Sequence, residues 1–170
     1  MIGGWNLNSW ETKENFLRDA ELFSPTTQEK DESYSFSYSV RGHKGSALTN
    51  SLVICGGTDA NNIVKNHCYR LSKGEDIWRP LPNMKHPRSY FGMSIIHPNQ
   101  IIVVGGITIQ ENSATTLNSV EWYNGQKWQS KKDAPFSVHS GCLMHLNETH
   151  LVLIGGMQED KKRVRNRYLV

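Results

Sequence analysis

The sequence contains no long hydrophobic run. Its longest aliphatic stretches, at 101–104 and 151–154, are only a few residues long, whereas a membrane-spanning helix needs roughly 20 apolar residues. The first residues show no basic segment followed by a hydrophobic one, so we expect no signal peptide and a cytoplasmic protein. The formal net charge of +3 is small, so we expect neither nucleic acid nor a membrane as a partner.

Cysteine is scarce, and its spacing indicates no site. Cys55, Cys68 and Cys142 are the three cysteines, and they form no CxxC pair. We therefore predict reduced, partly buried thiols rather than a disulfide framework or a metal site. The seven histidines show no HxH or HxxxH spacing. No nucleophile elbow, phosphate-binding loop or carboxylate pair occurs either, so we expect no metal, no cofactor and no enzyme activity.

Glycine, in contrast, is concentrated in pairs that recur about every 50 residues. Each pair follows a short apolar run, which predicts a buried β-strand that ends at the pair. The four pairs are Gly3 and Gly4, Gly56 and Gly57, Gly105 and Gly106, and Gly155 and Gly156. A repeat of this length with a strand that ends in two glycines is typical of a β-propeller.

One complete repeat lies between residues 90 and 132. The predicted strands lie at 92–97, 101–104 and 118–123, with a fourth from 127 onward. Asn124-Gly125 between the last two is a strong hairpin signal, and we expect a polar loop at 108–117. Four short antiparallel strands make one propeller blade.

The other repeats follow the same order. The first has no opening strand, and the last stops after its third strand. We predict an all-β fold with 14 antiparallel strands in four radially stacked sheets and no helix longer than two turns. Two complete four-stranded blades, at 41–86 and 87–136, lie between two partial blades, at 1–40 and 137–170.

Aromatic residues recur in phase with the glycine pairs. An aromatic stands in each third strand, at Phe23, Tyr69, Tyr123 and Tyr168. The fourth strands contain Trp78 and Trp128, and Tyr34 or Phe36 is the expected substitute in the first repeat. This pattern resembles the kelch repeat over essentially the whole chain. The resemblance implies that these aromatics pack between blades. It also implies a closed ring of usually six or seven blades, so we expect this chain to be part of a longer protein, with an open wedge that closes by dimerisation as the alternative.

The resemblance also implies a function. Kelch propellers commonly bind other proteins without catalysis, and many present substrates to a cullin ubiquitin ligase through a BTB domain. Other kelch proteins bind actin, and some secreted propellers with kelch-like blades are radical copper enzymes, for which Cys68 and Tyr69 would be candidate residues. We expect a non-enzymatic substrate-recognition propeller and keep the cytoskeletal and copper-enzyme alternatives. The oligomeric state is left open.

Variable loops indicate where a partner would bind, because recognition usually resides in the loops of a rigid scaffold. These loops lie at 5–17, 58–65, 107–117 and 157–163. In kelch substrate adaptors the residue two before the first glycine of strand 1 faces the central cavity, which here implies His43, Tyr90 and His139. Arg41 and Arg88 precede them and could bind the carboxylate of an acidic peptide. The alternative is that these arginines form ion pairs between blades.

Overall fold

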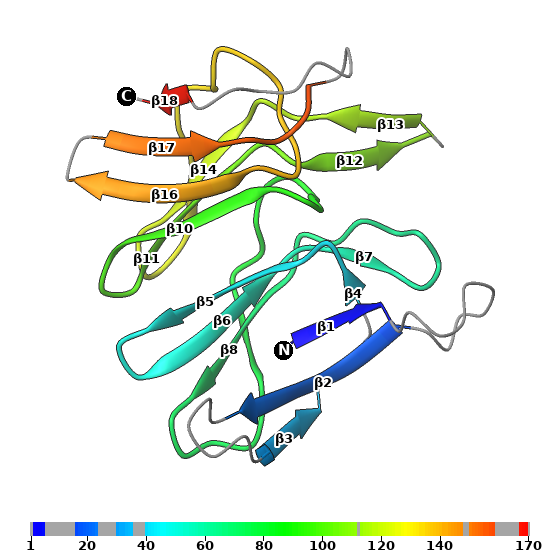
Figure 1. The fold of residues 1–170 in the computed structure, drawn as a ribbon, viewed down its shortest axis with the longest axis vertical. Helices are drawn as coiled ribbons and strands as arrows, with labels where there is room; N and C mark the ends of the chain where they lie inside the picture. Colours follow the sequence, from blue (N-terminus) through cyan, green and yellow to red (C-terminus); the bar gives the residue numbers. More distant parts are fainter. Residues whose placement is uncertain are drawn as a thin grey trace.

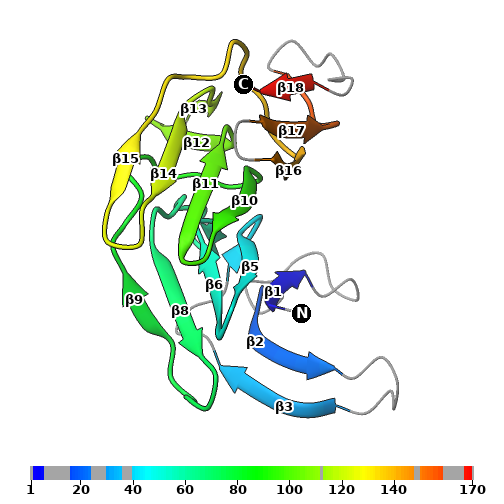
Figure 2. The same cartoon turned by 90° about the vertical axis from the view of Figure 1, so that its left-hand side faces the viewer.

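The computed structural model describes the backbone of residues 2–5, 16–23, 30–35, 40–111, 113–147, 150–158 and 167–169. The side chains of 40–111, 113–147 and 150–158 are also described. Every described strand pairs antiparallel, and the described ranges contain no helix. Figure 1 and Figure 2 show four main sheets stacked one after another, with each sheet next to its neighbour in the sequence.

The strands of the four main sheets run in chain order from the inner edge to the outer edge. The first sheet contains β1 (Ile2–Trp5), β2 (Phe16–Phe23) and β3 (Lys30–Ser35). The second contains β5 (Lys44–Leu48), β6 (Ser51–Cys55), β8 (Cys68–Ser72) and β9 (Arg79–Leu81). The third contains β10 (Gly92–His97), β11 (Gln100–Val104), β14 (Val120–Tyr123) and β15 (Trp128–Ser130). The fourth contains β16 (Cys142–Asn147), β17 (His150–Ile154) and β18 (Arg167–Leu169).

The predicted fold is confirmed: two four-stranded sheets lie between two three-stranded ones. The structure adds two small ribbons, β4 (Val40–Arg41) with β7 (Thr58–Asp59), and β12 (Ile107–Gln110) with β13 (Ser113–Thr116). The prediction of a polar loop at 108–117 was therefore wrong, because two strands form most of this segment. Threonine and isoleucine favour strands even where the segment is polar and exposed.

The glycine pairs lie where successive sheets meet. Gly57 and Gly106 have φ angles of 98° and 103°, in the left-handed region that glycine enters without steric cost. The Gly57 N–H donates to the carbonyl of Arg88 at 2.9 Å, and the Gly106 N–H donates to that of Val138 at 2.8 Å. A Cβ atom at Gly56 would collide with the same Arg88 carbonyl. The pairs therefore end a strand and also let the next repeat approach closely.

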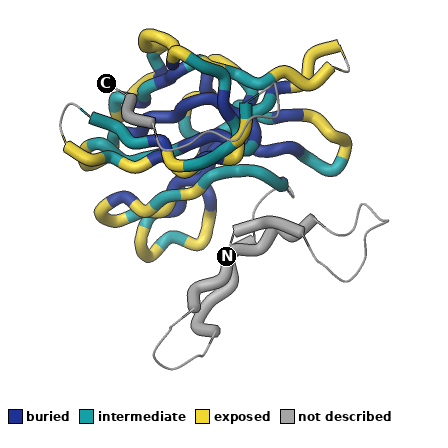
Figure 3. The backbone as a smooth tube through the Cα atoms, turned by 45° about the horizontal axis from the view of Figure 1, so that its top comes forward, coloured by how far each residue is buried: buried dark blue, intermediate teal, exposed yellow. Residues whose placement is uncertain are grey.

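Buried apolar residues of the second, third and fourth sheets form two core clusters, and Figure 3 colours the buried parts of the backbone dark blue. Between the second and third sheets, Tyr123 and Trp128 pack at 5.4 Å between ring centroids. The Trp128 Nε1–H donates to the Pro82 carbonyl of the preceding repeat at 2.9 Å. Trp78 and Trp128 are 8% and 6% exposed, so the predicted burial of both indoles is confirmed.

Strand pairing corrects the predicted register of two third-strand aromatics. Tyr123 lies opposite Ile101 in the third sheet, and the matching pair in the second sheet is Leu71 and Leu52. In the fourth sheet the matching pair is Leu169 and Leu151. Tyr69 therefore takes the place of Glu121, and Tyr168 takes that of Trp122. Because the connection after each glycine pair differs in length, counting from the glycines did not fix the register.

The first sheet keeps the predicted register of its aromatic. Ile2 lies opposite Ala20, as Val104 lies opposite Val120, so Phe23 matches Tyr123. Lys30 lies opposite Phe23, in the place of the fourth-strand tryptophan, and Tyr34 lies opposite Ala20. The prediction of Tyr34 as the substitute was therefore wrong, and Phe36 lies outside the described residues.

A disulfide joins Cys55 to Cys68, which corrects the prediction of three reduced thiols. The two residues lie directly opposite each other on β6 and β8, and both are 1% exposed. Opposed residues at a non-hydrogen-bonded position have closely spaced side chains. The sequence separation of 13 gave no hint of this pairing, because only the strand register creates it. Cys142 is a free, exposed thiol.

We expect reduction of the disulfide to lower the free energy of unfolding by about 3 kcal/mol, because the bond joins residues 13 positions apart and closing a loop of roughly this length in the unfolded chain contributes about that much. The measurement is urea denaturation with and without a thiol reductant, monitored by tryptophan fluorescence. The Cys142→Ser variant should respond to the reductant as the wild type does. Superimposable wild-type curves in the two buffers would show that the bond does not stabilise the fold.

Candidate functional site

The candidate site is formed by the segments that lead into the inner strands of the second, third and fourth sheets. Each segment bridges the residue that follows a glycine pair: Arg41 bridges Thr58, Ser89 bridges Ile107, and His139 bridges Met157. Figure 1 shows β7 and the β12–β13 ribbon on the same side of the molecule, opposite the hairpins that join β5 to β6 and β10 to β11. We call this side the connection face.

Three residues with left-handed backbones occupy matching positions on the connection face. Gly42, Tyr90 and Ser140 have φ angles of 65°, 55° and 58°. The Tyr90 N–H donates to the Gly42 carbonyl at 2.7 Å, and the Ser140 N–H donates to the Tyr90 carbonyl at 2.6 Å. A relay of backbone hydrogen bonds therefore runs across three successive repeats.

This relay corrects the predicted equivalence of His43, Tyr90 and His139. Tyr90 is itself a residue of the relay. In the second sheet the relay residue is Gly42, and His43 comes one position after it. In the fourth sheet the relay residue is Ser140, and His139 comes one position before it. The true counterpart of His139 in the second sheet is Arg41, because both form the bridge described above. The error arose because the first glycine of strand 1 does not stand at the same register in each repeat.

Arg41 is half-buried and donates through Nη2 to Asn62 Oδ1 at 2.7 Å. The loop that carries Asn62 is held by Asp59, whose Oδ1 accepts the backbone N–H groups of Asn61 and Ile63, both at 2.9 Å. Burial alone would raise the pKa of Asp59, but its hydrogen bonds to Lys65 and to these backbone groups outweigh it, so the pKa lies below its ordinary value. The carboxylate stays charged at neutral pH and fixes the loop beside Arg41.

His139 is half-buried, with its Nδ1 3.0 Å from Ser140 Oγ. Burial lowers the pKa of His139 below its ordinary value, so the imidazole is neutral at pH 7. Arg41 therefore supplies positive charge at this face, and His139 supplies a neutral polar group.

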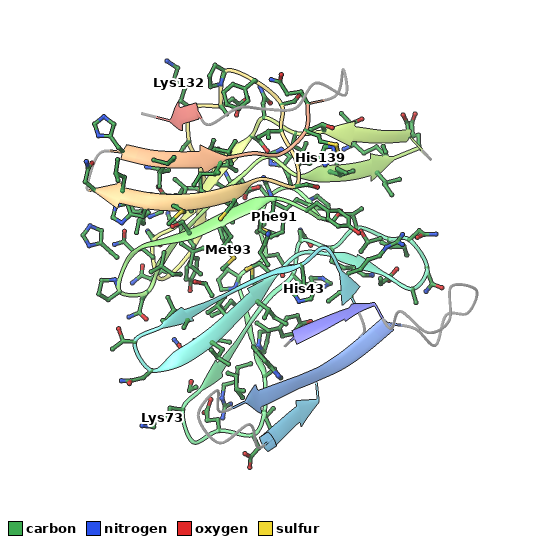
Figure 4. All side chains as sticks on the ribbon, viewed as in Figure 1. His43, Lys73, Phe91, Met93, Lys132 and His139 are labelled. Atoms are coloured by element: carbon green, nitrogen blue, oxygen red, sulfur yellow. A yellow bond between two sulfur atoms is a disulfide. The ribbon has the colours of Figure 1, made fainter. Side chains whose placement is uncertain are left out.

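Tyr90 and His43 lie close to the glycines of neighbouring segments. A Cβ atom at Gly42 would come within 2.8 Å of the Tyr90 ring, and one at Gly57 within 3.0 Å of the His43 Cβ. Both side chains are half-buried, and Figure 4 labels His43 and His139 on their separate segments. Arg41, Tyr90 and His139 therefore lie on the connection face in three successive repeats. His43 lies on the same segment as Arg41.

Arg88 does not belong to the connection face, and its prediction as a partner contact is corrected. Its side chain is 0% exposed. Nη2 donates to Glu121 Oε1 at 2.6 Å and to Ser119 Oγ at 3.0 Å, and Nη1 donates to the Gly105 carbonyl at 2.6 Å. Arg88 therefore forms a buried ion pair, as the alternative predicted, but with Glu121 of the same repeat rather than between blades.

Two features of the face were missed from the sequence. The β12–β13 ribbon was treated as an irregular loop, although its alternating threonine and isoleucine residues could have indicated strands. The Asn62 contact to Arg41 was also missed. Its signal was Asp59 with asparagines two and three residues later, at Asn61 and Asn62, since an aspartate often accepts the backbone N–H two residues later.

Within the described ranges, no helix is long and apolar enough to span a membrane. The same residues contain no group of three or more histidine, cysteine, aspartate or glutamate side chains placed to hold a metal ion.

Comparison with known proteins finds kelch proteins that are similar to this chain in sequence. No family model matches it. It is 25% identical over 145 residues to "Kelch repeat and BTB domain-containing protein 2" of Ectromelia virus (strain Moscow), which covers 84% of this chain and 25% of the relative. It is 38% identical over 96 residues to "Kelch-like protein 41a" of Danio rerio, which covers 53% of this chain and 15% of the relative. The chain thus spans a quarter or less of these relatives.

The fold is also shared with a solved structure. YjhT superposes with a TM-score of 0.78 at 15% identity, over 91% of this chain and 53% of that one. At this identity the likeness shows the fold alone, whereas the kelch-like relatives support a protein-interaction module. The in-phase glycine pairs, the stacked antiparallel sheets and these similarities show that the chain has the kelch-type β-propeller fold and is similar in sequence to kelch-like proteins.

Proposed function

We propose that the connection face binds an acidic peptide segment of a partner protein, without catalysis. The observation that carries the proposal is the half-buried Arg41, on a segment that the backbone relay from Gly42 joins to Tyr90 and to Ser140, which follows His139. A guanidinium offers a planar set of donors matched to a carboxylate, and its charge does not vary with pH. One donor is directed to Asn62, which orients the group and lowers the entropy lost on binding.

Rigid aromatic and polar groups complete the proposed contact. The Tyr90 backbone is fixed by the relay on both sides, so its ring is presented with little freedom to lose. Tyrosine and arginine are the residue types that contribute most at protein interfaces. The neutral imidazole of His139 adds an adaptable hydrogen-bonding group without adding charge.

The test is a peptide-display selection against the protein, followed by affinity measurements on the selected peptides. We expect enrichment of acidic sequences and at least tenfold weaker binding by Arg41→Ala. The matched control is Arg79→Ala, because Arg79 is a 66% exposed arginine on the outer strand β9. Selected peptides without acidic residues, or equal losses in the two variants, would overturn the proposal.

At a finer level, we propose that this face recognises substrates for a ubiquitin-ligase adaptor. The support is the Ectromelia virus relative, whose name includes a BTB domain alongside kelch repeats. The cytoskeletal alternative predicts co-sedimentation with actin filaments, and a saturable, Arg41-dependent pellet would favour it over the adaptor.

The copper-enzyme alternative loses its candidate cysteine, because the Cys68 sulfur is bonded to Cys55. A cytoplasmic location stays a prediction.

A further inference from the structure

A polar pocket of about 380 Å³ lies between the second and third sheets, a volume in the range of small-ligand sites. The third sheet contributes the turns at 98–100 and 123–126, and the second sheet contributes Leu48, Arg70 and Leu81. Figure 2 shows both turns at the end of the third sheet that lies toward the second sheet. The β10–β11 turn is on the side opposite the connection face, so the pocket is separate from the site described above.

Arg70 supplies the charge of this pocket. It is half-buried, and the described lining residues include no aspartate or glutamate. Arg70 lies directly opposite Arg79 on the neighbouring strand, an arrangement in which like charges repel. Glu75 pairs with Arg79 at 3.0 Å, whereas none of the ion pairs between described residues includes Arg70. One positive charge of the two arginines is therefore left unbalanced.

Two side-chain amides of the pocket have their oxygen atoms already in use. Gln100 Oε1 accepts the indole N–H of Trp122 at 3.2 Å. Asn124 Oδ1 accepts the backbone N–H groups of Gln126 and Lys127 at 3.0 and 2.9 Å. Because an indole and a backbone N–H can only donate, these bonds fix the orientation of both amides. The amide nitrogens, Gln100 Nε2 and Asn124 Nδ2, are therefore left to bind a ligand, and both are donors.

The Tyr123 hydroxyl completes the wall without adding negative charge. Its O–H donates to the Gly125 carbonyl at 2.9 Å. Burial raises the pKa of Tyr123 above its ordinary value, and the positive charge of Arg70 opposes this rise, so the phenol keeps its proton at neutral pH. The pocket thus presents a guanidinium and two amide donors, a set that suits an oxyanion.

We propose that this pocket binds a carboxylate, through the guanidinium of Arg70 and the amide donors of Gln100 and Asn124. A guanidinium offers a planar fork that matches the two oxygens of a carboxylate. The single unbalanced charge also matches one carboxylate, whereas a phosphate monoester carries about −1.5 to −2 charges at pH 7 and would stay partly uncompensated. A small organic acid and the C-terminal residue of a peptide present this same group.

The test is a titration of the ¹⁵N-labelled 170-residue protein, followed by NMR of its side-chain amide and guanidinium signals. The probes are acetate and an N-acetylated dipeptide with a free C-terminus, and their controls are acetamide and the same dipeptide with an amidated C-terminus. We expect saturable shifts of the Arg70, Gln100 and Asn124 signals with both carboxylates and at least tenfold weaker binding of both amides. A dipeptide that binds at least tenfold more tightly than acetate would identify a peptide C-terminus as the source, and similar affinities would identify a small acid. No saturable shift at these signals, or tighter binding of inorganic phosphate than of acetate, would overturn the proposal.

A matched pair of arginine variants separates the donor fork from the general positive charge. Arg70→Gln should weaken acetate binding at least tenfold, whereas Arg79→Gln, which removes the same charge from the opposite strand, should change it less than threefold. Equal losses in the two variants would overturn the proposal.

A substitution in the β14–β15 turn tests the amide donor. Asn124→Asp keeps an oxygen for the Gln126 and Lys127 N–H groups but replaces the Nδ2 donor with a charged acceptor. It should also weaken acetate binding at least tenfold, with folding checked by circular dichroism. Acetate binding by folded Asn124→Asp that equals the wild type would contradict the assignment of Asn124 to the site.

Discussion

Replacing Trp128 by alanine should lower the free energy of unfolding by about 3–5 kcal/mol, the range for truncation of a large core aromatic. The indole is 6% exposed and packs between the second and third sheets, so its removal leaves a cavity that spans two repeats. It also removes the part-buried hydrogen bond from the indole to the Pro82 carbonyl, which adds to the cost. Urea denaturation measured by circular dichroism gives the change.

The control for this variant is Trp122→Ala in the same sheet. Trp122 is half-buried on the opposite face, where its Nε1–H donates to Gln100 at 3.2 Å and Lys131 Nζ lies 4.0 Å from the ring centroid. Its loss removes less buried surface and should cost clearly less than the loss of Trp128. If the two variants were equally stable, the packing between sheets would not depend on the fourth-strand tryptophan. Trp78→Ala should resemble Trp128→Ala, since the two indoles are similarly buried.

Separating the Arg88 and Glu121 pair should destabilise the protein by about 3–5 kcal/mol, because removal of one partner leaves a buried charge uncompensated. Both side chains are almost completely buried, at 0% and 1% exposure. The single variants are Arg88→Met and Glu121→Leu, and the double variant combines the two substitutions. We expect the double variant to lose less than the sum of the single losses, as measured by urea denaturation. Strictly additive losses would contradict a direct interaction.

The same glutamate should make stability depend on pH. Burial raises the pKa of Glu121, but hydrogen bonds from the Lys85 and His86 backbone and the charge of Arg88 outweigh it, so the pKa lies below its ordinary value. A depressed pKa contributes stability that is fully present above the ordinary glutamate value, about 4.3, and is lost as pH falls through the folded-state value. The stability difference between wild type and Glu121→Gln should therefore shrink in acid. A difference that stays constant down to pH 3 would contradict this.

The sequence predicted those parts of the fold that depend on local pattern. The glycine pairs located the inner strands and the contact points between repeats, because both the left-handed backbone and the close approach require glycine. Trp78 and Trp128 were placed correctly in the core. The Cys55–Cys68 bond could not be predicted, because it depends on the register between β6 and β8, which the connection between them sets.

The candidate site, too, could be predicted from the sequence only in part. Arg41 and Arg88 look alike in sequence, each shortly before an inner strand, yet one is half-exposed and the other fully buried. In an extended segment successive side chains point to opposite sides. A shift of one residue relative to the bridging position therefore separates the two arginines: Arg41 forms the bridge, whereas Arg88 precedes Ser89, which does. Only the paired structure reveals that shift.

The buried ion pair also limits how the repeats could have been shuffled during evolution. Arg88 and Glu121 belong to one repeat, while Val40 and Tyr69 hold the matching positions in the repeat before it and pack in one apolar cluster. Duplication of a whole repeat carries both charges together and keeps them neutralised. A crossover between the two positions would join one charge to an apolar partner in a closed interior. Gene conversion among such repeats should therefore favour breakpoints outside the interval from 88 to 121.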